Sequence, residues 1–294
     1  MVLQSPLKIQ VLVSALNNDI DTLPSQMNIE TDAVIVNQCD RYDYKEFPVP
    51  MPEEKKTESD AKVSYESKSG GVNASPGRIQ CICMPERGVG LSRNTALLHA
   101  DADICLFSDE DIVLAKGYAK QIRTAYMKYP DADMIIFNVK VSERRRTYWN
   151  NGVKRIRWYN YSRYPAYSIS GKLEAFRRAN VYFSLLFGGG AKYSNGEDSL
   201  FLRDCIKAGL KIYAHPLCIG EEIERESTWF HGYTEKFFTD RGVLYSYLYG
   251  KMAKALALRF LLRNKGEMYR DIPFKKAYRL MHKGIRSQRK HNKE

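Results

Sequence analysis

A short apolar segment that ends in three acidic residues constrains the fold of this chain more than any other feature. Residues 104–107 read Ile-Cys-Leu-Phe, and Asp109, Glu110 and Asp111 follow after one serine. Apolar runs of this length, rich in branched and aromatic residues, predict a buried strand. Side chains two residues apart in a strand point to the same side. We therefore expect Asp109 and Asp111 to emerge together at the carboxyl end of a strand, where open α/β sheets bind ligands. An acidic turn that caps a following helix is the alternative interpretation.

A second acidic pair, Glu197 and Asp198, precedes a segment whose leucines and isoleucine recur at helical intervals up to Gly209. Acids at the start of a helix can simply cap it and favour its dipole. One of them could instead take a proton from an acceptor hydroxyl. Carboxylates at the strand end would meanwhile suit a divalent cation that shares its coordination shell with phosphate oxygens and water. Together the two acidic groups are the set needed for transfer from a diphosphate-linked donor.

Strands and helices are expected to alternate along most of the chain, which predicts an α/β fold. Between the first two strands, residues 17–24 are expected to form a loop with at most one turn. Residues 42–77 are rich in Pro, Glu, Lys, Ser and Gly and predict a flexible insertion or a lid. Further strands are expected over residues 9–14, 33–37, 79–84 and 134–141, and helices over 90–100 and 112–129.

Five segments in this order resemble the family 2 glycosyltransferases. They are residues 11–17, 32–38, 86–94 and 109–111, and Gly196-Glu197-Asp198 with Arg203. The resemblance covers roughly residues 8–220. It implies the GT-A fold, with a Rossmann-like mixed or parallel sheet flanked by helices. It also implies an inverting displacement in which a sugar moves from a nucleoside diphosphate, UDP above all, to a hydroxyl of a glycan or lipid-linked acceptor.

The resemblance also implies roles for individual residues. A divalent cation, Mn²⁺ or Mg²⁺, would be held by Asp111 together with Asp109, and Asp198 would be the base, with Glu197 as the weaker candidate. Arg93 and Asn94 would face the nucleotide, although as first-turn residues of a helix they could equally be structural. The donor-binding set is Ser14, Ala15, Asn17, Asn37, Gln38, Arg93, Asn94, Asp109 and Glu110.

One departure from the family concerns the base of the nucleotide. The family usually carries acidic residues after its second strand that bind the uracil ring, whereas this chain has Asn37-Gln38-Cys39-Asp40. An amide oxygen can still accept from the imide N–H, and an amide NH₂ can donate to a ring carbonyl. Nucleotide recognition is therefore retained in principle, while the assignment to UDP is weakened.

Residues 144–161 interleave arginines with aromatic residues, among them Trp149 and Trp158. Such a surface could stack on nucleic-acid bases, bind a sugar or a lipid-linked acceptor, or be a hairpin whose aromatics pack inward. Its position between the two acidic motifs favours the acceptor, as in the resembled enzymes. Gly196 is a further candidate for acceptor binding. Arg203 could bind the acceptor, orient Asp198, contact phosphate or lie on a plain helix surface. Residues 188–190 are all glycine and predict a mobile loop over the acceptor site.

Charge is distributed unevenly along the 294 residues, whose formal net charge is +12. Residues 251–294 contain 14 Lys or Arg against three acidic residues, a local net charge of +11, and leave the rest nearly neutral. We expect a catalytic domain over 1–220 and a basic, mostly helical region over 221–294. The basic region could contact an anionic membrane surface through 251–294 or be a solvated tail. Nucleic acid is disfavoured because no nucleic-acid-binding motif accompanies the charge.

The remaining features predict a cytoplasmic enzyme that could associate peripherally with the inner face of the membrane. No secretory segment or bilayer-spanning run is recognised, and six scattered cysteines are typical of a reduced protein. His215 and His231 could each be a structural histidine or a metal ligand. The predicted function is surface polysaccharide biosynthesis. An inactive nucleotide-sugar-binding protein, or a membrane or nucleic-acid adaptor on the same fold, is the alternative.

Overall fold

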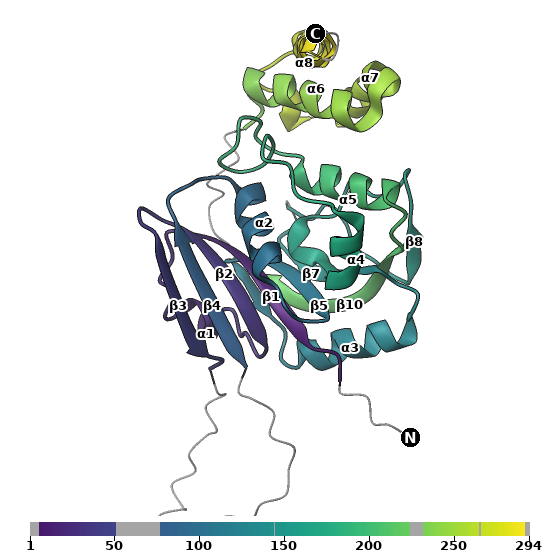
Figure 1. Ribbon diagram of the computed structural model, residues 1–294. Helices are drawn as coiled ribbons and strands as arrows, with labels where there is room; N and C mark the ends of the chain where they lie inside the picture. The colour runs from purple at the N-terminus through teal and green to yellow at the C-terminus, as the bar shows by residue number, and fades with distance from the viewer. Residues whose placement is uncertain (1–5, 51–76, 144, 224–231, 265, 292–294) are drawn as a thin grey trace, which may run out of the picture.

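The computed structural model describes residues 6–50, 77–143, 145–223, 232–264 and 266–291 (Figure 1). Within these residues ten strands form one mixed sheet. The strand order is β3 (Asp43–Pro48), β4 (Arg78–Met84), β2 (Asp32–Gln38), β1 (Ile9–Leu16), β5 (Ile104–Asp109), β9 (Ile169–Lys172), β7 (Met134–Lys140), β10 (Ile212–Glu222) and β6 (Ile112–Leu114), and β8 (Lys154–Ile156) pairs with β10. Strands β4, β2, β1 and β5 are parallel, whereas β9 runs antiparallel between β5 and β7.

The central strands are apolar on both faces because helices cover both sides of the sheet. In β1, Val11 and Val13 face one core while Leu12 faces the other, and β5 divides Leu106 and Phe107 in the same way. One core is closed by α1 (Leu23–Gln26) and α3 (Tyr118–Lys128), and the other by α2 (Val89–His99), α4 (Leu173–Ala179) and α5 (Glu197–Lys207). The expected α/β fold with a mixed sheet flanked by helices is confirmed. The short 3₁₀ segment η1 (Ala166–Ser168) leads into β9.

The helix expected over residues 112–129 is wrong in its first part. Ile112 and Leu114 are buried on either side of a half-buried Val113, an alternation that belongs to a strand. These three residues form β6, which pairs antiparallel with residues 220–222 of β10. The helix α3 begins only at Tyr118. An apolar run of three residues next to a helix is too short to distinguish the alternation of a strand from the spacing of a helix.

The expected insertion over residues 42–77 also contains a strand. Asp43–Pro48 pairs antiparallel with β4 and forms one edge of the sheet. Its residues are mostly exposed and several are charged, as is common on edge strands, where charge discourages pairing with another chain. The rest of the predicted insertion, residues 51–76, lies outside the described residues. The one-turn helix α1 and the other expected strands agree with the prediction within one or two residues.

Three helices follow β10 and enclose a core of their own. They are α6 (Glu235–Tyr249), α7 (Ala253–Arg263) and α8 (Phe274–His291), with the short 3₁₀ segments η2 (Gly250–Met252) and η3 (Glu267–Tyr269) between them. The buried side chains of this core include Phe238, Leu261, Met281 and Ile285. Figure 1 shows the three helices grouped together beyond α5 and away from the sheet. No helix among the described residues combines the length and the apolar character needed to cross a membrane.

Two glycines bring α6 and α8 into backbone contact. A Cβ atom added to Gly242 would lie 2.1 Å from the carbonyl oxygen of Met281, and one added to Gly284 would lie 2.1 Å from that of Thr239. Real Cβ atoms do not approach so closely, so any side chain at these positions pushes the helices apart. The close crossing therefore depends on glycine at both positions.

We expect Gly242→Ala to destabilise the α6–α8 group by about 1–3 kcal/mol, the usual cost of overpacking a well-packed contact. Gly152→Ala is the matched control because nothing lies within 4 Å of the added Cβ. Urea unfolding followed by circular dichroism measures both variants. Equal stability of the two variants would contradict the close crossing of α6 and α8.

Candidate active site

A pocket of about 380 Å³ lies at the carboxyl ends of β1, β2 and β5 and at the amino ends of α2 and α5. This is the edge at which open α/β sheets bind ligands. Its lining contains both predicted acidic groups together with residues from the segment between β8 and β9. The lining residues are Ser14, Ala15, Leu16, Gln38, Val89, Arg93, Asp109, Glu110, Asp111, Arg145, Pro165, Tyr167, Gly189, Ser194, Asn195, Gly196, Glu197 and Asp198.

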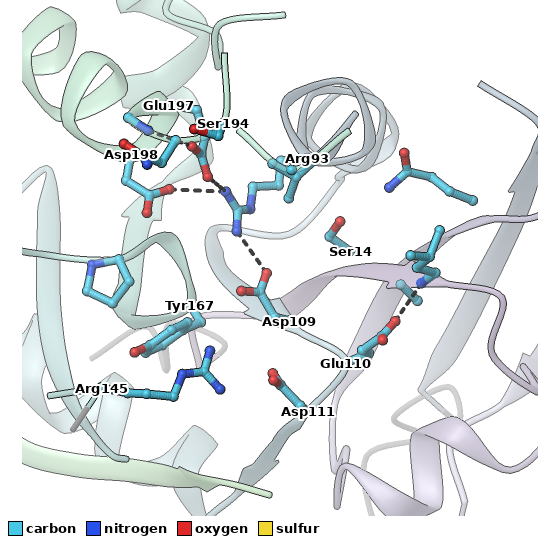
Figure 2. A pocket seen from close by; sticks show the side chains of 18 residues that line it. Ser14, Arg93, Asp109, Glu110, Asp111, Arg145, Tyr167, Ser194, Glu197 and Asp198 are labelled. Atoms are coloured by element: carbon cyan, nitrogen blue, oxygen red, sulfur yellow. Dashed lines mark hydrogen bonds and ion pairs between the residues drawn. The ribbon is translucent and has the colours of Figure 1, made fainter. Parts of the chain in front are cut away.

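Arg93 joins the two acidic groups directly. Figure 2 shows its guanidinium in the middle of the pocket wall, between the end of β5 and the start of α5. Nη2 lies 2.9 Å from Oδ1 of Asp109, and Nη1 lies 3.0 Å from Oε1 of Glu197 and 3.1 Å from Oδ1 of Asp198. The Arg93 side chain is only 4% exposed, and its guanidinium also lies 5.4 Å from the ring centre of Phe183. A single buried cation thus sets the distance between two acidic groups that are 88 positions apart in sequence.

The pKa values of Arg93 and Asp198 are both raised, for different physical reasons. Burial alone would lower the pKa of Arg93, but the charges of Asp109, Asp198 and Glu197 outweigh it, so the pKa of Arg93 is raised and the side chain stays protonated. The pKa of Asp198 is raised well above its ordinary value, first by burial and then by the charge of Glu197, against the opposing effect of Arg93. Asp198 nevertheless keeps 25% of its side chain exposed, toward the pocket. It therefore combines an elevated proton affinity with access to a ligand.

The three acids at the strand end point in different directions. Asp109 and Asp111 line the pocket, as their spacing predicts. Glu110 turns toward the end of β1, where its carboxylate accepts hydrogen bonds from the backbone N–H of Leu16 and from Nδ2 of Asn18. The backbone that follows β1 is thereby held against the strand end that carries the aspartates (Figure 2).

Several predicted donor-binding residues support the pocket rather than line it. The side-chain amide of Asn37 accepts from the backbone N–H of Asn18 and donates to its carbonyl oxygen. Asn94 does the same with the backbone of Phe183. Asn17, Asn37 and Asn94 are absent from the lining, whereas Ser14, Ala15, Gln38 and Arg93 are part of it. Gln38 uses its Oε1 to accept from the backbone N–H of Gly88, at the start of α2.

The wall of the pocket that contains Ser194 and Gly196 is held in place by α6 of the C-terminal helices. Asp240 of α6 accepts hydrogen bonds from both the backbone N–H and the hydroxyl of Ser194. Gly196 has a φ of +116°, and a Cβ atom there would lie 2.5 Å from the side chain of Leu244 on α6. The loop that leads into Glu197 and Asp198 is thus fastened to α6, and only glycine fits at position 196.

The structure does not bring the other predicted acceptor residues to the pocket. Trp149 and Trp158 are 43% and 75% exposed and are not part of the lining. Arg203 instead pairs with Asp204 and donates to the backbone carbonyl of Tyr247, which connects α5 to α6. His215 also lies elsewhere: its ring contacts Tyr129 and Phe137. His231 lies outside the described residues.

Sequence reasoning missed three side chains that line the pocket opposite Arg93. Arg145 carries a salt bridge of 2.6 Å to Glu222, whose side chain is 1% exposed. Pro165 and Tyr167 come from the segment that leads through η1 into β9. Figure 2 shows Arg145 and Tyr167 on the same side of the pocket as Asp111. The arginine-rich run drew attention to this region, but nothing in the local sequence distinguished Arg145 from its neighbours.

Comparison with known proteins places the fold without placing the chain in a family. No family model and no curated protein sequence matches it. Among solved structures, S. aureus TarS residues 1–349 in complex with UDP-GlcNAc aligns over 87% of this chain and 72% of its own, with a TM-score of 0.53 and 16% identity. The same TarS fragment in complex with UDP aligns over 87% and 71%, with a TM-score of 0.52 and 14% identity. At this identity the similarity establishes a shared α/β fold.

Removal of the Arg93 guanidinium is expected to lower the free energy of unfolding substantially. In Arg93→Met three carboxylates lose a buried partner, and a broken buried ion pair costs about 3–5 kcal/mol of unfolding free energy near neutral pH. Arg78→Met is the matched control. Arg78 also contacts two carboxylates, Glu46 and Asp101, but is 45% exposed, so its loss should cost about 1 kcal/mol or less.

The pKa of Asp198 determines how the stability lost in Arg93→Met changes with pH. A carboxyl whose pKa is raised on folding favours the folded state at low pH, and this contribution is lost as the pH rises through the raised pKa. Without Arg93 that pKa rises further, so the deficit of Arg93→Met should shrink as the pH is lowered. Urea denaturation over a pH series measures both variants, and a deficit that grows on acidification would contradict the buried cluster.

Proposed function

We propose that this chain is an inverting, metal-dependent glycosyltransferase. It moves a sugar from a nucleoside diphosphate, UDP in the first instance, to a hydroxyl of a glycan or lipid-linked acceptor of a surface polysaccharide. The observation that carries the proposal is the salt-bridge cluster in which Arg93 ties Asp109 to Glu197 and Asp198 within one pocket. The TarS complexes support it because that protein holds UDP-GlcNAc and UDP on the same fold.

The charge of the pocket accounts for the need for a cation. Five carboxylates line it, against the guanidinium groups of Arg93 and Arg145. Arg93 is already shared between three of those carboxylates. A diphosphate that enters such a pocket is repelled unless positive charge comes with it. An anionic donor and an acidic pocket are compatible only when a counter-ion accompanies the donor.

Asp109 and Asp111 fit a divalent cation that is completed by its substrate. No group of three or more His, Cys, Asp or Glu side chains in the described ranges is placed to hold a metal by itself. Mg²⁺ and Mn²⁺ at phosphate-transfer sites commonly use one or two carboxylates together with phosphate oxygens and water. A cation held there would stabilise the charge that develops on the departing diphosphate.

Asp198 is the proposed base. The acceptor hydroxyl oxygen bonds to the anomeric carbon, the bond from that carbon to the diphosphate oxygen breaks with its electron pair, and the hydroxyl proton passes to Asp198. The raised pKa of Asp198 favours this transfer, because a carboxylate with higher proton affinity is a stronger base. Arg93 holds Asp198 and the strand end at a fixed separation. The diphosphate of the donor would then lie on the Asp109 side of Arg93, and the acceptor hydroxyl on the Asp198 side.

Arg145 is a second cation available to the donor. Glu222 holds one of its terminal nitrogens, while 41% of the Arg145 side chain is exposed. Its planar group can form paired hydrogen bonds with phosphate oxygens. Arg145 would therefore contact the diphosphate from the side of the pocket opposite Arg93.

Asp198→Asn should bind the donor normally but lose sugar transfer by at least about 100-fold, the usual contribution of a general base. The measurement is product formation over a panel of nucleotide sugars and acceptors with Mn²⁺, together with donor affinity by calorimetry. Asp131→Asn is the control, because Asp131 is an exposed carboxylate bound to Tyr213 and Lys211. Near-normal turnover in Asp198→Asn would remove Asp198 as the base. A wild-type chain that binds donors without transfer or slow donor hydrolysis would indicate an inactive binding protein.

Asp111→Asn should abolish the metal-dependent part of donor binding. In the wild-type chain, UDP-sugar and Mn²⁺ together should raise the melting temperature more than either does alone, because a ligand that binds only the folded state stabilises it. The variant should respond no more strongly to the mixture than the wild type does in the presence of a chelator. A full response in the variant, or an equal wild-type response with the chelator, would exclude metal binding at Asp111.

A further inference from the structure

Helix α7 carries a second apolar face that points away from the protein. Its inward face buries Ala253, Ala257 and Leu261 in the core of the C-terminal helices. The opposite face is formed by Ala255, Leu258, Arg259, Leu262 and Arg263, which together line a shallow open depression. We call these five residues the outer stripe. Their spacing of three and four residues places them along one side of the helix.

The outer stripe exposes apolar surface that the fold does not need. Leu258 is 36% exposed and Leu262 is 52% exposed, and Met252, one turn before the stripe, is 63% exposed. A helix normally buries one apolar stripe and presents polar residues on the other side. Neighbouring exposed apolar side chains on a surface helix are typical of an interaction site.

Exposed cations lie on α7, within and beside the outer stripe, and on α8, which packs against α7. Lys251, Arg259 and Arg263 are exposed on or beside α7, and α8 exposes a row of basic residues along one side, namely Lys275, Lys276, Arg279, Lys283 and Arg286. Of these eight, only Lys276 forms an ion pair within the part of the chain that the structure describes, with Glu235.

One cation of α7 and one of α8 act on the same histidine of α8. The pKa of His282 on α8 is lowered by burial and then by the charges of Lys254 from α7 and Arg286 from α8. Like charges destabilise one another where they gather, unless a polyanion or an anionic surface covers them. Helices α7 and α8 pack against each other, and both expose cations in addition to the apolar side chains of the stripe.

We propose that the outer stripe and the cations beside it dock on an anionic phospholipid bilayer. Leu258, Leu262 and Met252 would enter the boundary between headgroups and acyl chains while the arginines contact lipid phosphates, as in other interfacial helices. Basic residues near such a surface are attracted by its negative potential. This proposal rests on the C-terminal helices and does not depend on the reaction proposed above.

Two other partners fit the surface less well. In a symmetric dimer that buries the stripe against itself, Arg259 and Arg263 would face their own copies, and this repulsion opposes the contact. A nucleic acid would satisfy the cations but would leave Leu258 and Leu262 exposed. Only a bilayer supplies both an anionic layer and an apolar layer behind it.

The position of the helices links docking to the pocket. Asp240 and Leu244 of α6 hold the loop of Ser194 and Gly196 that forms the acceptor side, and α6 packs along α8 (Figure 1). A bilayer beneath α7 and α8 would therefore lie one helix away from the acceptor side of the pocket. Such an arrangement suits an acceptor that is itself attached to lipid.

Co-sedimentation of the full chain with vesicles tests whether the cations of the outer stripe contribute to membrane binding. We expect binding to phosphatidylcholine vesicles that contain phosphatidylglycerol, no binding to phosphatidylcholine alone, and weakening as salt is raised. Arg259→Glu/Arg263→Glu should lower the affinity at least about tenfold. Lys116→Glu/Lys120→Glu changes the net charge equally on exposed sites near and within α3 and should have little effect. Equal losses in the two double variants would indicate diffuse attraction and overturn the proposal, as would no binding by the wild-type chain.

A second pair of variants tests the apolar contribution. Leu258→Ser/Leu262→Ser should also lower vesicle affinity, whereas Leu98→Ser/Met127→Ser, at side chains that are 64% and 67% exposed on α2 and α3, should not. Circular dichroism and light scattering of each variant report folding and oligomeric state. Loss of a dimer in Leu258→Ser/Leu262→Ser with vesicle binding unchanged would assign the stripe to a second copy and overturn the proposal. Binding of an oligonucleotide that depends on Arg259 and Arg263, without vesicle binding, would also overturn it.

Discussion

The pocket depends on one buried cation. Arg93 lies in the pocket wall with 4% of its side chain exposed, and three carboxylates from β5 and α5 converge on it. Without that charge, Asp109, Glu197 and Asp198 would repel one another across a poorly solvated space, and the carboxyl end of β5 and the amino end of α5 could not share a wall. The same cluster also sets the electrostatic environment of Asp198. The cation keeps the acids together, while the proximity of Glu197 and the burial of the site raise the pKa of Asp198.

The surroundings of the cluster are held by contacts to the backbone of neighbouring segments. Glu110 binds the backbone after β1, Asn37 and Asn94 each bind the backbone of a neighbouring loop, and Gly196 lies directly against Leu244 of α6. These contacts fix the loops around the pocket, and Glu110 and Gly196 also line it. They also connect the pocket to the C-terminal helices, because α6 holds the loop of Ser194 and Gly196 and also packs against α8.

Several differences between the sequence-based expectations and the structure share a cause. Residues 112–114 belong to β6 because β10 pairs with them, and a three-residue strand beside a helix leaves too short a pattern to recognise. Trp149, Trp158 and Arg203, which the sequence proposes for acceptor binding, do not line the pocket, because composition does not tell which side of an element faces it. Tyr167 and Pro165 line the pocket although nothing in their local sequence marks them.

The sequence by itself determined the α/β class, the strand that presents Asp109 and Asp111, the helix that begins with Glu197 and Asp198, and the concentration of charge after residue 250. Each of these is a local pattern of period, cap or composition, which neighbouring residues fully specify. Only the tertiary structure decided that Arg93 joins the two acidic groups, that Asn37 and Asn94 support loops, and that α7 faces outward with an apolar stripe. Those facts depend on contacts between residues far apart in the chain, and a local pattern carries no information about the direction in which a side chain finds its partner.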